Sequence, residues 1–395
     1  MNRCAKCGAC TAVCPLYQVS GRESLAARGK LHLMSRLDPA AASPAYAEIL
    51  SGCLLCGACR EVCPQGVDPP ARIVAARGRL ARGADRHFWR KFLANRVLAR
   101  PQVLNMALGL AGAAAGVLAR HLPPESGLRL RLGLITGGTG SVPRHGRYVD
   151  GAAPVAHPRI AYFVGCLADH LEPGIARATA RLARLTTGAP PAVPAGQGCC
   201  GQAAAACGDF TLARTLAKRN IEAFASDGVP ILTSCASCYR HLLTYPELLR
   251  EDPGWHPRAA AFAARVRELA TFLQGRFVPE PQTAAAVLYH DPCHLRHGVS
   301  ITAEPRQLLT AAGLHLTELP GGPRCCGQGG LFHLAHPDLS AMVRDRLLAA
   351  FRPLAADLVT TTCSGCLLQW RQGLALAGSR VRVRHLAEVL AGTQE

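Results

Sequence analysis

The sequence has few acidic residues and few aromatic ones. Aspartate and glutamate number 26 against 44 lysines and arginines, which gives a formal net charge of +18, and only 5% of residues are aromatic. The excess positive charge favours an anionic partner surface or membrane headgroups. Nucleic-acid binding is the rival interpretation, but the arginines are scattered singly and no basic run with interleaved aromatic residues occurs. We therefore expect no nucleic-acid partner.

Long apolar runs are also missing. No stretch reaches the roughly 18 to 20 apolar residues that a membrane-spanning helix needs. The nearest candidate is Val103 to Ala119, which is rich in small residues and flanked by Arg100 and Arg120. We interpret it as a pair of buried helices, since small residues allow close helix packing. A shallow peripheral membrane contact is the alternative.

Charged residues make up only 18% of the 395 residues and apolar residues 49%, so a packed interior in two to four domains is expected. Nineteen cysteines would indicate a disulfide framework in a short secreted chain. This chain is long and opens with Met1 to Cys4, which leaves no room for an apolar export segment. We expect a cytoplasmic protein, on the inner face of the membrane if the peripheral contact exists, whose cysteines bind metal.

Two copies of one cysteine pattern occupy the first 64 residues. The pattern Cys-x-x-Cys-x-x-Cys-x-x-x-Cys-Pro covers residues 4–15 and returns at residues 53–64. It is the spacing of bacterial ferredoxins with two 4Fe-4S clusters, in which the fourth cysteine of each run ligates the other cluster. A pair of zinc sites is the alternative, but zinc ligands usually come in two pairs. The predicted ligands are Cys4, Cys7, Cys10 and Cys63 for one cluster, and Cys53, Cys56, Cys59 and Cys14 for the other.

A second cysteine pattern is duplicated in the remaining chain. Residues 158–275 (the first repeat) and 276–395 (the second repeat) each contain a single cysteine, a Cys-Cys-Gly and a Cys-x-x-Cys, and corresponding cysteines lie 126 to 128 residues apart. Five thiolates at one place indicate an iron-sulfur cluster, or a zinc site with a spare redox thiol. Cys207 is left over and is expected to be a small buried residue. The candidate ligands are Cys166, Cys199, Cys200, Cys235 and Cys238, and Cys293, Cys325, Cys326, Cys363 and Cys366.

Strand and helix patterns alternate in both repeats, which predicts parallel α/β units with ligands beyond the carboxyl ends of the strands. The expected strands are 160–164, 230–234, 286–289 and 357–361, and the expected helices 172–185, 209–224 and 337–350. The fold class predicted is α+β: an N-terminal helical two-cluster ferredoxin-type module over 1–80 (the N-terminal module), a helical linker over 81–157, and the two α/β repeats with parallel sheets.

The motifs together resemble the glycolate oxidase iron-sulfur subunit family, whose members join a two-cluster ferredoxin module to two cysteine-rich CCG domains. Beyond the cysteines, the runs 14–17, 21–23, 28–34 and 290–296 carry the resemblance. The iron-sulfur subunit of anaerobic glycerol-3-phosphate dehydrogenase and the CCG subunits of heterodisulfide reductases are similar too. The resemblance implies non-cubane 4Fe-4S clusters at the CCG cysteines, with zinc as the alternative.

The resemblance also implies a function. A separate FAD-containing flavoprotein would oxidise a 2-hydroxy acid, and this chain would pass the electrons to quinone or another acceptor. The sequence has no Gly-x-Gly-x-x-Gly after a strand, which is consistent with hydride transfer on a partner. Two alternatives stay open: a CCG reductase that cleaves a disulfide directly, and an adaptor whose CCG sites bind structural zinc. No catalytic residue is assigned.

Three histidine and glycine features near these cysteines have two interpretations each. His290 and His294 flank Cys293, and His294 would tune a cluster or relay protons, although a structural histidine is commoner. The run Gly327 to Gly330 looks like a phosphate loop, but it follows Cys326 directly. Backbone approach to a cluster explains it better.

Overall fold

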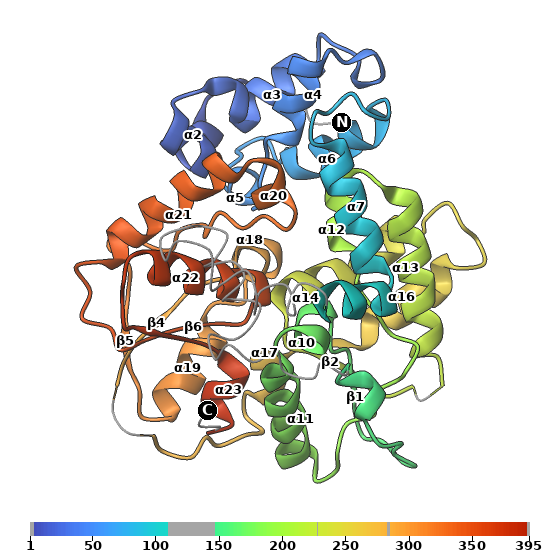
Figure 1. The fold of residues 1–395 in the computed structure, drawn as a ribbon, viewed down its shortest axis with the longest axis vertical. Coiled ribbons are helices and arrows are strands. Elements are labelled where there is room, and N and C mark those ends of the chain that lie inside the picture. Colours follow the sequence, from blue (N-terminus) through green and yellow to red (C-terminus); the bar gives the residue numbers. More distant parts are fainter. Residues whose placement is uncertain (1–3, 110–146, 227, 283–284, 393–395) are drawn as a thin grey trace.

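The computed structural model describes residues 4–109, 147–226, 228–282 and 285–392 (Figure 1). The N-terminal module lies at the top of the view, the first repeat at the right and the second repeat at the left. Residues 110–119 of the apolar stretch lie outside the described residues, and residues 101–109 are helical. In the ranges described, no helix is long and apolar enough to span a bilayer.

The N-terminal module consists of short helices. Three of them begin at Pro15, Pro44 and Pro69, because a proline at the first helical position gives up no helical hydrogen bond. Ser43 and Asp68 accept hydrogen bonds from first-turn amides and so cap two of these helices. The elements are α1 Ala9–Ala12, α2 Pro15–Ser20, η1 Glu23–Leu25, α3 Ala27–Met34, η2 Pro39–Ala41, α4 Pro44–Ser51, α5 Ala58–Glu61 and α6 Pro69–Arg79.

The first repeat has a three-stranded parallel sheet of order β1-β2-β3. Helix α7, Phe88–Ala99, connects the N-terminal module to it and packs beside α12 (Figure 1). A short turn, η3 Val149–Gly151, precedes the sheet. The elements of the repeat are β1 Ala161–Tyr162, α10 Cys166–His170, α11 Pro173–Thr187, α12 Gln202–Cys207, α13 Phe210–Ala223, β2 Ile231–Thr233, α14 Ala236–Leu242, α15 Tyr245–Leu248, α16 His256–Arg265, β3 Val266–Glu268 and α17 Leu269–Leu273.

The second repeat has a four-stranded parallel sheet of order β5-β4-β6-β7. Every strand pair described in the two sheets is parallel, as the alternating pattern predicted. The elements are β4 Ala286–Tyr289, α18 Cys293–Val299, α19 Ala303–Ala311, β5 His315–Thr317, α20 Phe332–Ala335, α21 Pro337–Phe351, β6 Leu358–Thr361, α22 Ser364–Leu376, β7 Arg382–His385 and α23 Leu386–Leu390. The predicted α+β fold class is confirmed.

One hydrophobic core joins the two repeats. Helix α11 of the first repeat packs against α23 of the second, and Leu182 and Leu390 belong to the same buried cluster. The Arg371 guanidinium on α22 donates to the Glu172 carboxylate, next to the start of α11, at 2.5 Å. The repeats are therefore packed as one body, and the domain boundaries drawn from the sequence stay a prediction.

Arg77 on α6 fixes the N-terminal module to the first repeat. Its side chain is buried, at 9% exposed, and its guanidinium donates four hydrogen bonds, all to backbone carbonyl oxygens. Three acceptors lie in the segment that leads from α4 into the second cysteine loop, and the fourth lies on α12. The acceptors are Leu50 at 2.9 Å, Ser51 at 2.8 Å, Cys53 at 2.9 Å and Ala206 at 2.6 Å.

The end of α4 also contacts the second repeat, and α6 approaches the backbone of the first repeat very closely. The Ser51 hydroxyl lies 2.6 Å from Nε2 of His336, which precedes α21. Near Arg77, a Cβ added at Gly208 would lie 2.5 Å from the backbone nitrogen of Gly78. Such contact leaves no room for a side chain at Gly208, whose φ of +84° also favours glycine.

Replacing Arg77 by alanine should therefore lower the free energy of unfolding by about 3 kcal/mol, because it strands several buried carbonyl groups. Arg79→Ala is the matched control. Arg79 makes an exposed ion pair with Asp38, and its loss should lower the free energy of unfolding by less than about 1 kcal/mol. Denaturant unfolding of both variants measures the difference, and equal losses would contradict the assignment.

Candidate functional site

The carboxyl ends of four strands each lead into a cysteine. Cys166 and Cys293 begin α10 and α18, and Cys235 and Cys363 occupy the N-cap positions of α14 and α22. Because the strands of each sheet are parallel, their carboxyl ends meet at one edge. Cysteines far apart in the sequence are thereby brought to that edge.

In the first repeat, the five predicted cysteines form a continuous series of thiol contacts. Cys199 contacts Cys166 and Cys200, and Cys238 contacts Cys200 and Cys235. Hydrogen bonding from Cys166 and then from Cys200 lowers the pKa of Cys199. Contacts with Cys200 and Cys235, together with burial, raise the pKa of Cys238.

The second repeat repeats this arrangement. Cys325 contacts Cys293 and Cys326, and Cys366 contacts Cys326 and Cys363. The Sγ atoms of Cys326 and Cys366 are 3.3 Å apart. Hydrogen bonding from Cys325 and then from Cys366 lowers the pKa of Cys326. The structure thus brings together each of the two predicted sets of five.

The two five-cysteine groups adjoin one another. Cys235 of the first repeat hydrogen bonds Cys363 of the second, and this contact raises the pKa of Cys363 to about 12. Between them lies Ser237, whose Oγ is 3.3 Å from Cys363 Sγ and 2.9 Å from Nδ1 of His294. The ten cysteines are therefore one connected region.

The two cysteine loops of the N-terminal module share an unusual backbone. Lys6 and Leu55, each just before the second cysteine of its loop, have φ of 58° and 54°. Only one other non-glycine residue in the described ranges has a positive φ. Gly8 and Gly57 follow with φ of 88° and 89°. Such strain at equivalent positions is typical of ligand-binding loops and indicates the same loop structure twice.

The first of these loops encloses a small cavity. Three of its cysteines line that cavity together with two from the second loop. The five are Cys4, Cys7, Cys10, Cys59 and Cys63. Both Cys59 and Cys63 of the second loop thus approach the first loop, and the crossover of fourth cysteines stays a prediction.

Cys14 and Cys53 form the other meeting point of the loops. Burial raises the pKa of both Cys14 and Cys59, and the nearby Cys53 thiolate raises them further. Lys30 is fully buried beside them and hydrogen bonds the carbonyl oxygens of Leu25 and Ser24. Burial lowers the pKa of Lys30 to about 8, against the opposing effect of the Cys53 and Cys14 thiolates. Lys30 is a neighbour of the site that spacing alone does not reveal.

Cys56 connects the N-terminal module to the second repeat. Burial raises its pKa well above the usual value, and the next contributions come from Cys325 and Cys293. Its neighbour Gly57 packs on α18, since a Cβ there would lie 3.1 Å from His297 Cβ. The second loop of the N-terminal module therefore lies against the cysteines of the second repeat.

The donor groups fit iron-sulfur clusters. In three loops a backbone amide donates to a cysteine sulfur, and hydrogen bonds to the sulfurs are among the features by which a protein tunes such clusters. The contacts are Leu55 N to Cys53 Sγ at 3.5 Å, Gly201 N to Cys199 Sγ at 3.5 Å and Gly327 N to Cys325 Sγ at 3.4 Å. The last contact supports the cluster interpretation of the Gly327 to Gly330 run. Which cysteines hold which cluster stays a prediction.

Buried histidines border both repeats' cysteines. A ring nitrogen of His290 lies within 4.8 Å of the Cys326 and Cys366 sulfurs, and its Nδ1 has no hydrogen-bond partner in the described structure. Burial lowers the pKa of His290, His294 and His241 to about 4. Sequence reasoning missed His241, although its place three residues after Cys238 puts both on one face of α14.

Cys207 stands apart from the ten. It ends α12 and is half-buried rather than fully buried as expected from the sequence. Burial raises its pKa, and its other influences include Lys91, Arg77 and Asp85. No other cysteine in the described residues is among those influences. It serves as a natural control for metal binding.

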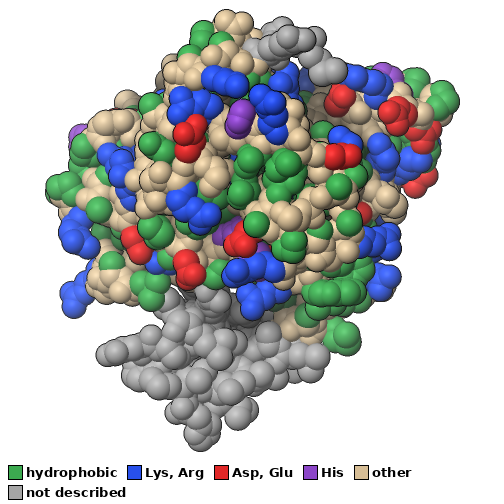
Figure 2. Space-filling view, turned by 90° about the horizontal axis from the view of Figure 1, so that it is seen from above, with side chains coloured by type: hydrophobic (Ala, Val, Ile, Leu, Met, Phe, Trp, Pro, Cys, Tyr) green, Lys and Arg blue, Asp and Glu red, His purple; other side chains and the backbone are tan. Residues whose placement is uncertain are grey.

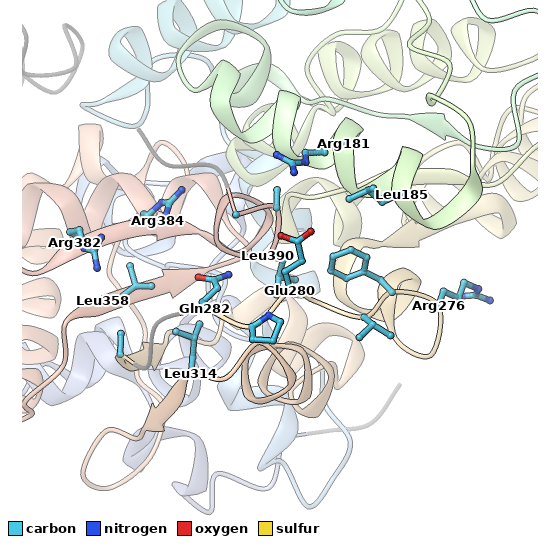
Figure 3. A pocket seen from close by; sticks show the side chains of 16 residues that line it. Arg181, Leu185, Arg276, Glu280, Gln282, Leu314, Leu358, Arg382, Arg384 and Leu390 are labelled. Atoms are coloured by element: carbon cyan, nitrogen blue, oxygen red, sulfur yellow. The ribbon is translucent and has the colours of Figure 1, made fainter.

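Basic side chains are spread over the face that the N-terminal module presents (Figure 2). They alternate there with hydrophobic and acidic side chains rather than forming a single basic stripe. Four arginines are among the residues that line a cavity of about 960 Å³ elsewhere (Figure 3). Leu358 and Arg382, which line it, begin β6 and β7. This cavity is therefore at the opposite edge of the sheet from the cysteines.

Comparisons with known proteins agree with the motifs. A family model described as a 4Fe-4S dicluster domain matches residues 1–67, and one described as a cysteine-rich domain, CCG, matches residues 160–243 and 287–371. The predicted pair of 4Fe-4S clusters is confirmed at the level of this family. A solved structure of a hypothetical protein from Helicobacter pylori has a TM-score of 0.45 at 10% identity, covering 63% of this chain and 53% of that one.

Curated relatives are named for glycolate oxidation or lactate utilization. The probable glycolate oxidase iron-sulfur subunit of Bacillus subtilis is 33% identical over 252 residues, which is 62% of this chain and 56% of that protein. The chain thus spans little more than half of that relative. Lactate utilization protein A of an Exiguobacterium species is 34% identical over 238 residues, 59% of this chain and 97% of that protein. The Bacillus subtilis lactate utilization protein A is 32% identical, with 59% and 98% covered.

Replacing Lys30 by methionine should lower the reduction potential of the neighbouring N-terminal site by tens of millivolts, because a buried positive charge stabilises the more negative reduced state. Lys218→Met is the control, since Lys218 pairs with Asp252 on the first repeat. Redox titration followed by electron paramagnetic resonance gives both potentials. An unchanged reduction potential in Lys30→Met would show that the Lys30 charge does not influence this site.

Replacing Cys326 by serine should reduce the iron content of the purified chain, whereas Cys207→Ser should leave it unchanged. Two cubane clusters account for about eight iron atoms per chain, and filled CCG sites would raise the count toward about sixteen. Iron and zinc analysis of both variants measures this. Equal metal content in the two variants would contradict ligation by Cys326.

Proposed function

The chain belongs to the CCG family of iron-sulfur proteins that includes lactate utilization protein A and the glycolate oxidase iron-sulfur subunit, and from this premise we propose that it is the electron-transfer subunit of a 2-hydroxy-acid oxidoreductase. A separate FAD-containing flavoprotein oxidises glycolate or lactate and delivers the electrons to this chain. The chain passes them to quinone or another acceptor.

The unbroken succession of cysteine groups supports this proposal. It runs from the N-terminal loops through Cys56 to Cys293 and Cys325, and from Cys363 across to Cys235. An adaptor with purely structural sites would not need adjoining groups, because structural metal sites work in isolation.

The proposed ligand sets are the eight cysteines of the N-terminal module and the five of each repeat. Bound 4Fe-4S clusters supply one-electron transfer there. The chain's own residues hold those sites close together, bury Cys199, Cys200, Cys235 and Cys238 away from water, and place Lys30 beside the second loop. This arrangement suits a chain that transfers electrons from one partner to another.

A direct disulfide reductase is the second candidate. Contacts with neighbouring thiols lower the pKa of Cys199, Cys235 and Cys326, and the thiolate is the form that attacks a disulfide. The electron-transfer role is favoured because these three residues also belong to the proposed ligand sets, where the metal would occupy the thiolates.

The proposal places the chain at the cytoplasmic face of a membrane. A quinone acceptor resides in the bilayer, and the net charge of +18 favours anionic headgroups. The partner flavoprotein contributes the hydroxy-acid pocket and the hydride step.

Anaerobic addition of the flavoprotein partner and its 2-hydroxy acid should bleach the visible iron-sulfur absorbance of the oxidised chain. Omitting the flavoprotein, or supplying acetate in place of the hydroxy acid, should leave the absorbance unchanged. Absence of bleaching with both glycolate and lactate would rule out the proposed donor.

A further inference from the structure

Three side chains that can bind metal meet in the second repeat. A ring nitrogen of His290 and the Sγ atoms of Cys326 and Cys366 all lie within 4.8 Å of one another, and all three residues are buried. Imidazole nitrogen and thiolate sulfur are both common ligands of iron and zinc. His290 is the member of this group that the duplicated cysteine pattern does not contain.

Rigid elements hold the His290 ring in this place. The residue directly follows β4, and its backbone nitrogen donates to the carbonyl oxygen of Thr360 on β6 at 2.8 Å. Its ring meets the Trp370 indole edge to face, with the ring centroids 5.6 Å apart. Trp370 is 1% exposed and lies four residues after Cys366 on α22. The sheet and this indole therefore keep the imidazole beside the two sulfurs, as a metal ligand requires.

The His290 ring lacks the hydrogen bonds that a histidine of the core normally has. Buried polar groups in proteins are nearly always hydrogen bonded. His385 in the same repeat is an example, because its Nε2 lies 3.1 Å from the Ser234 carbonyl oxygen and its Nδ1 accepts from the Ala387 amide at 3.1 Å. His290 is also buried, at 2% exposed, but its Nδ1 has no hydrogen-bond partner in the residues that the structure describes. Hydrogen bonding in the core therefore does not explain why a histidine is buried here.

The first repeat has no histidine at the equivalent position. Counted from the cysteines that correspond, His290 of the second repeat matches Phe163 of the first. Phe163 is fully buried, in the same hydrophobic cluster as Cys200 and Cys238. The second repeat thus has a nitrogen donor where the first has a hydrocarbon ring.

The other buried histidines near the cysteines are less suited to bind metal. His241 of the first repeat corresponds to Gln369 of the second. His241 and His294 each have Nδ1 within 3.2 Å of a neighbouring hydroxyl group. Within the described ranges, neither of them belongs to a group of three possible metal ligands. The geometry therefore favours His290.

A second group of three possible ligands is already held by hydrogen bonds. Glu48, His87 and His336 also have donor atoms within 4.8 Å of one another. However, Arg86 Nε lies 3.1 Å from His87 Nε2, and Arg86 also pairs with Glu48 at 3.6 Å. His336 Nε2 lies 2.6 Å from the Ser51 hydroxyl. A guanidinium beside two of the three donors would also repel a metal cation.

We propose that His290 is a nitrogen ligand of the iron-sulfur centre in the second repeat. The inference rests on the proposed electron-transfer function and makes the two repeats chemically different, because the first offers sulfur ligands alone and the second offers sulfur and nitrogen. Imidazole is neutral where a thiolate is negative, and imidazole ligands raise the reduction potential of an iron-sulfur centre. The second repeat therefore holds the more oxidising centre of the two.

Pulsed electron paramagnetic resonance tests the ligand directly. The metal-loaded chain is prepared with histidine that carries heavy nitrogen and is reduced with dithionite. A nitrogen bound to iron should give a strong coupling from this isotope, which His290→Phe should abolish. His294→Leu is the matched control and should keep the coupling, since each substitution installs the residue of the first repeat, Phe163 or Leu167. No strong histidine coupling in the native chain, or its persistence in His290→Phe, would overturn the proposal.

A second variant, His290→Cys, separates loss of the ligand from loss of the fold. It exchanges a neutral nitrogen for a thiolate, so it should keep the native iron content, lose the histidine coupling and lower the midpoint potential of one centre in a redox titration. An unchanged set of midpoint potentials would count against nitrogen ligation.

The native chain also distinguishes failure of this ligand from failure of the proposed function. Iron in the repeats without a histidine coupling would overturn the His290 ligand and leave the electron-transfer function intact. Iron restricted to the N-terminal module, at about eight atoms per chain, would overturn both. Neither measurement requires the flavoprotein, so neither depends on the proposed electron donor.

Discussion

The placement of the N-terminal cysteines beside those of the repeats depends on how the N-terminal module is fixed against them, and the buried Arg77 guanidinium ties that module to the first repeat. One planar group holds the segment before Cys53 and the carbonyl of Ala206 on α12 at once. Further contacts hold the module to the second repeat, where the Ser51 hydroxyl hydrogen bonds His336 and the Arg60 guanidinium donates to the carbonyl oxygen of His297. Electron transfer falls steeply with distance, so rigid attachment matters more here than the strength of any single bond.

Sequence periodicity predicted the central strands and the long helices well. Strands β2, β4 and β6 and helices α11, α13 and α21 lie within a few residues of their expected positions. Buried parallel strands are apolar runs, and α11 and α13 carry a strong amphipathic stripe. Strands β3, β5 and β7 were not expected. They are edge strands of three or four residues, and each includes an exposed residue, so none of the three presents an apolar run.

At the candidate site, the sequence predicted the cysteine groups whose members are close in the chain. It did not predict the neighbours that only tertiary packing brings to those groups. Cysteine spacing identified all eighteen candidate ligands, since each motif is a loop whose residues are close in the chain. It did not predict that Cys56 lies beside Cys325, nor that Lys30 and His241 border the sites. Lys30, and the approach of Cys56 to Cys325, involve elements more than 15 residues apart in the chain, which no local pattern marks. His241 is different, because its place three residues after Cys238 on α14 could have indicated it.

The hydrophobic core shared by α11 and α23 limits how the duplicated repeats can evolve. A duplicated gene normally leaves two copies that can be separated again, but here neither copy could bury its apolar face alone. Truncation at the repeat boundary would expose Leu182 and its neighbours and yield an aggregating fragment rather than a one-site protein. Once the copies had merged their interiors, they could diverge in chemistry, as His241 and Gln369 have, but could no longer be lost one at a time.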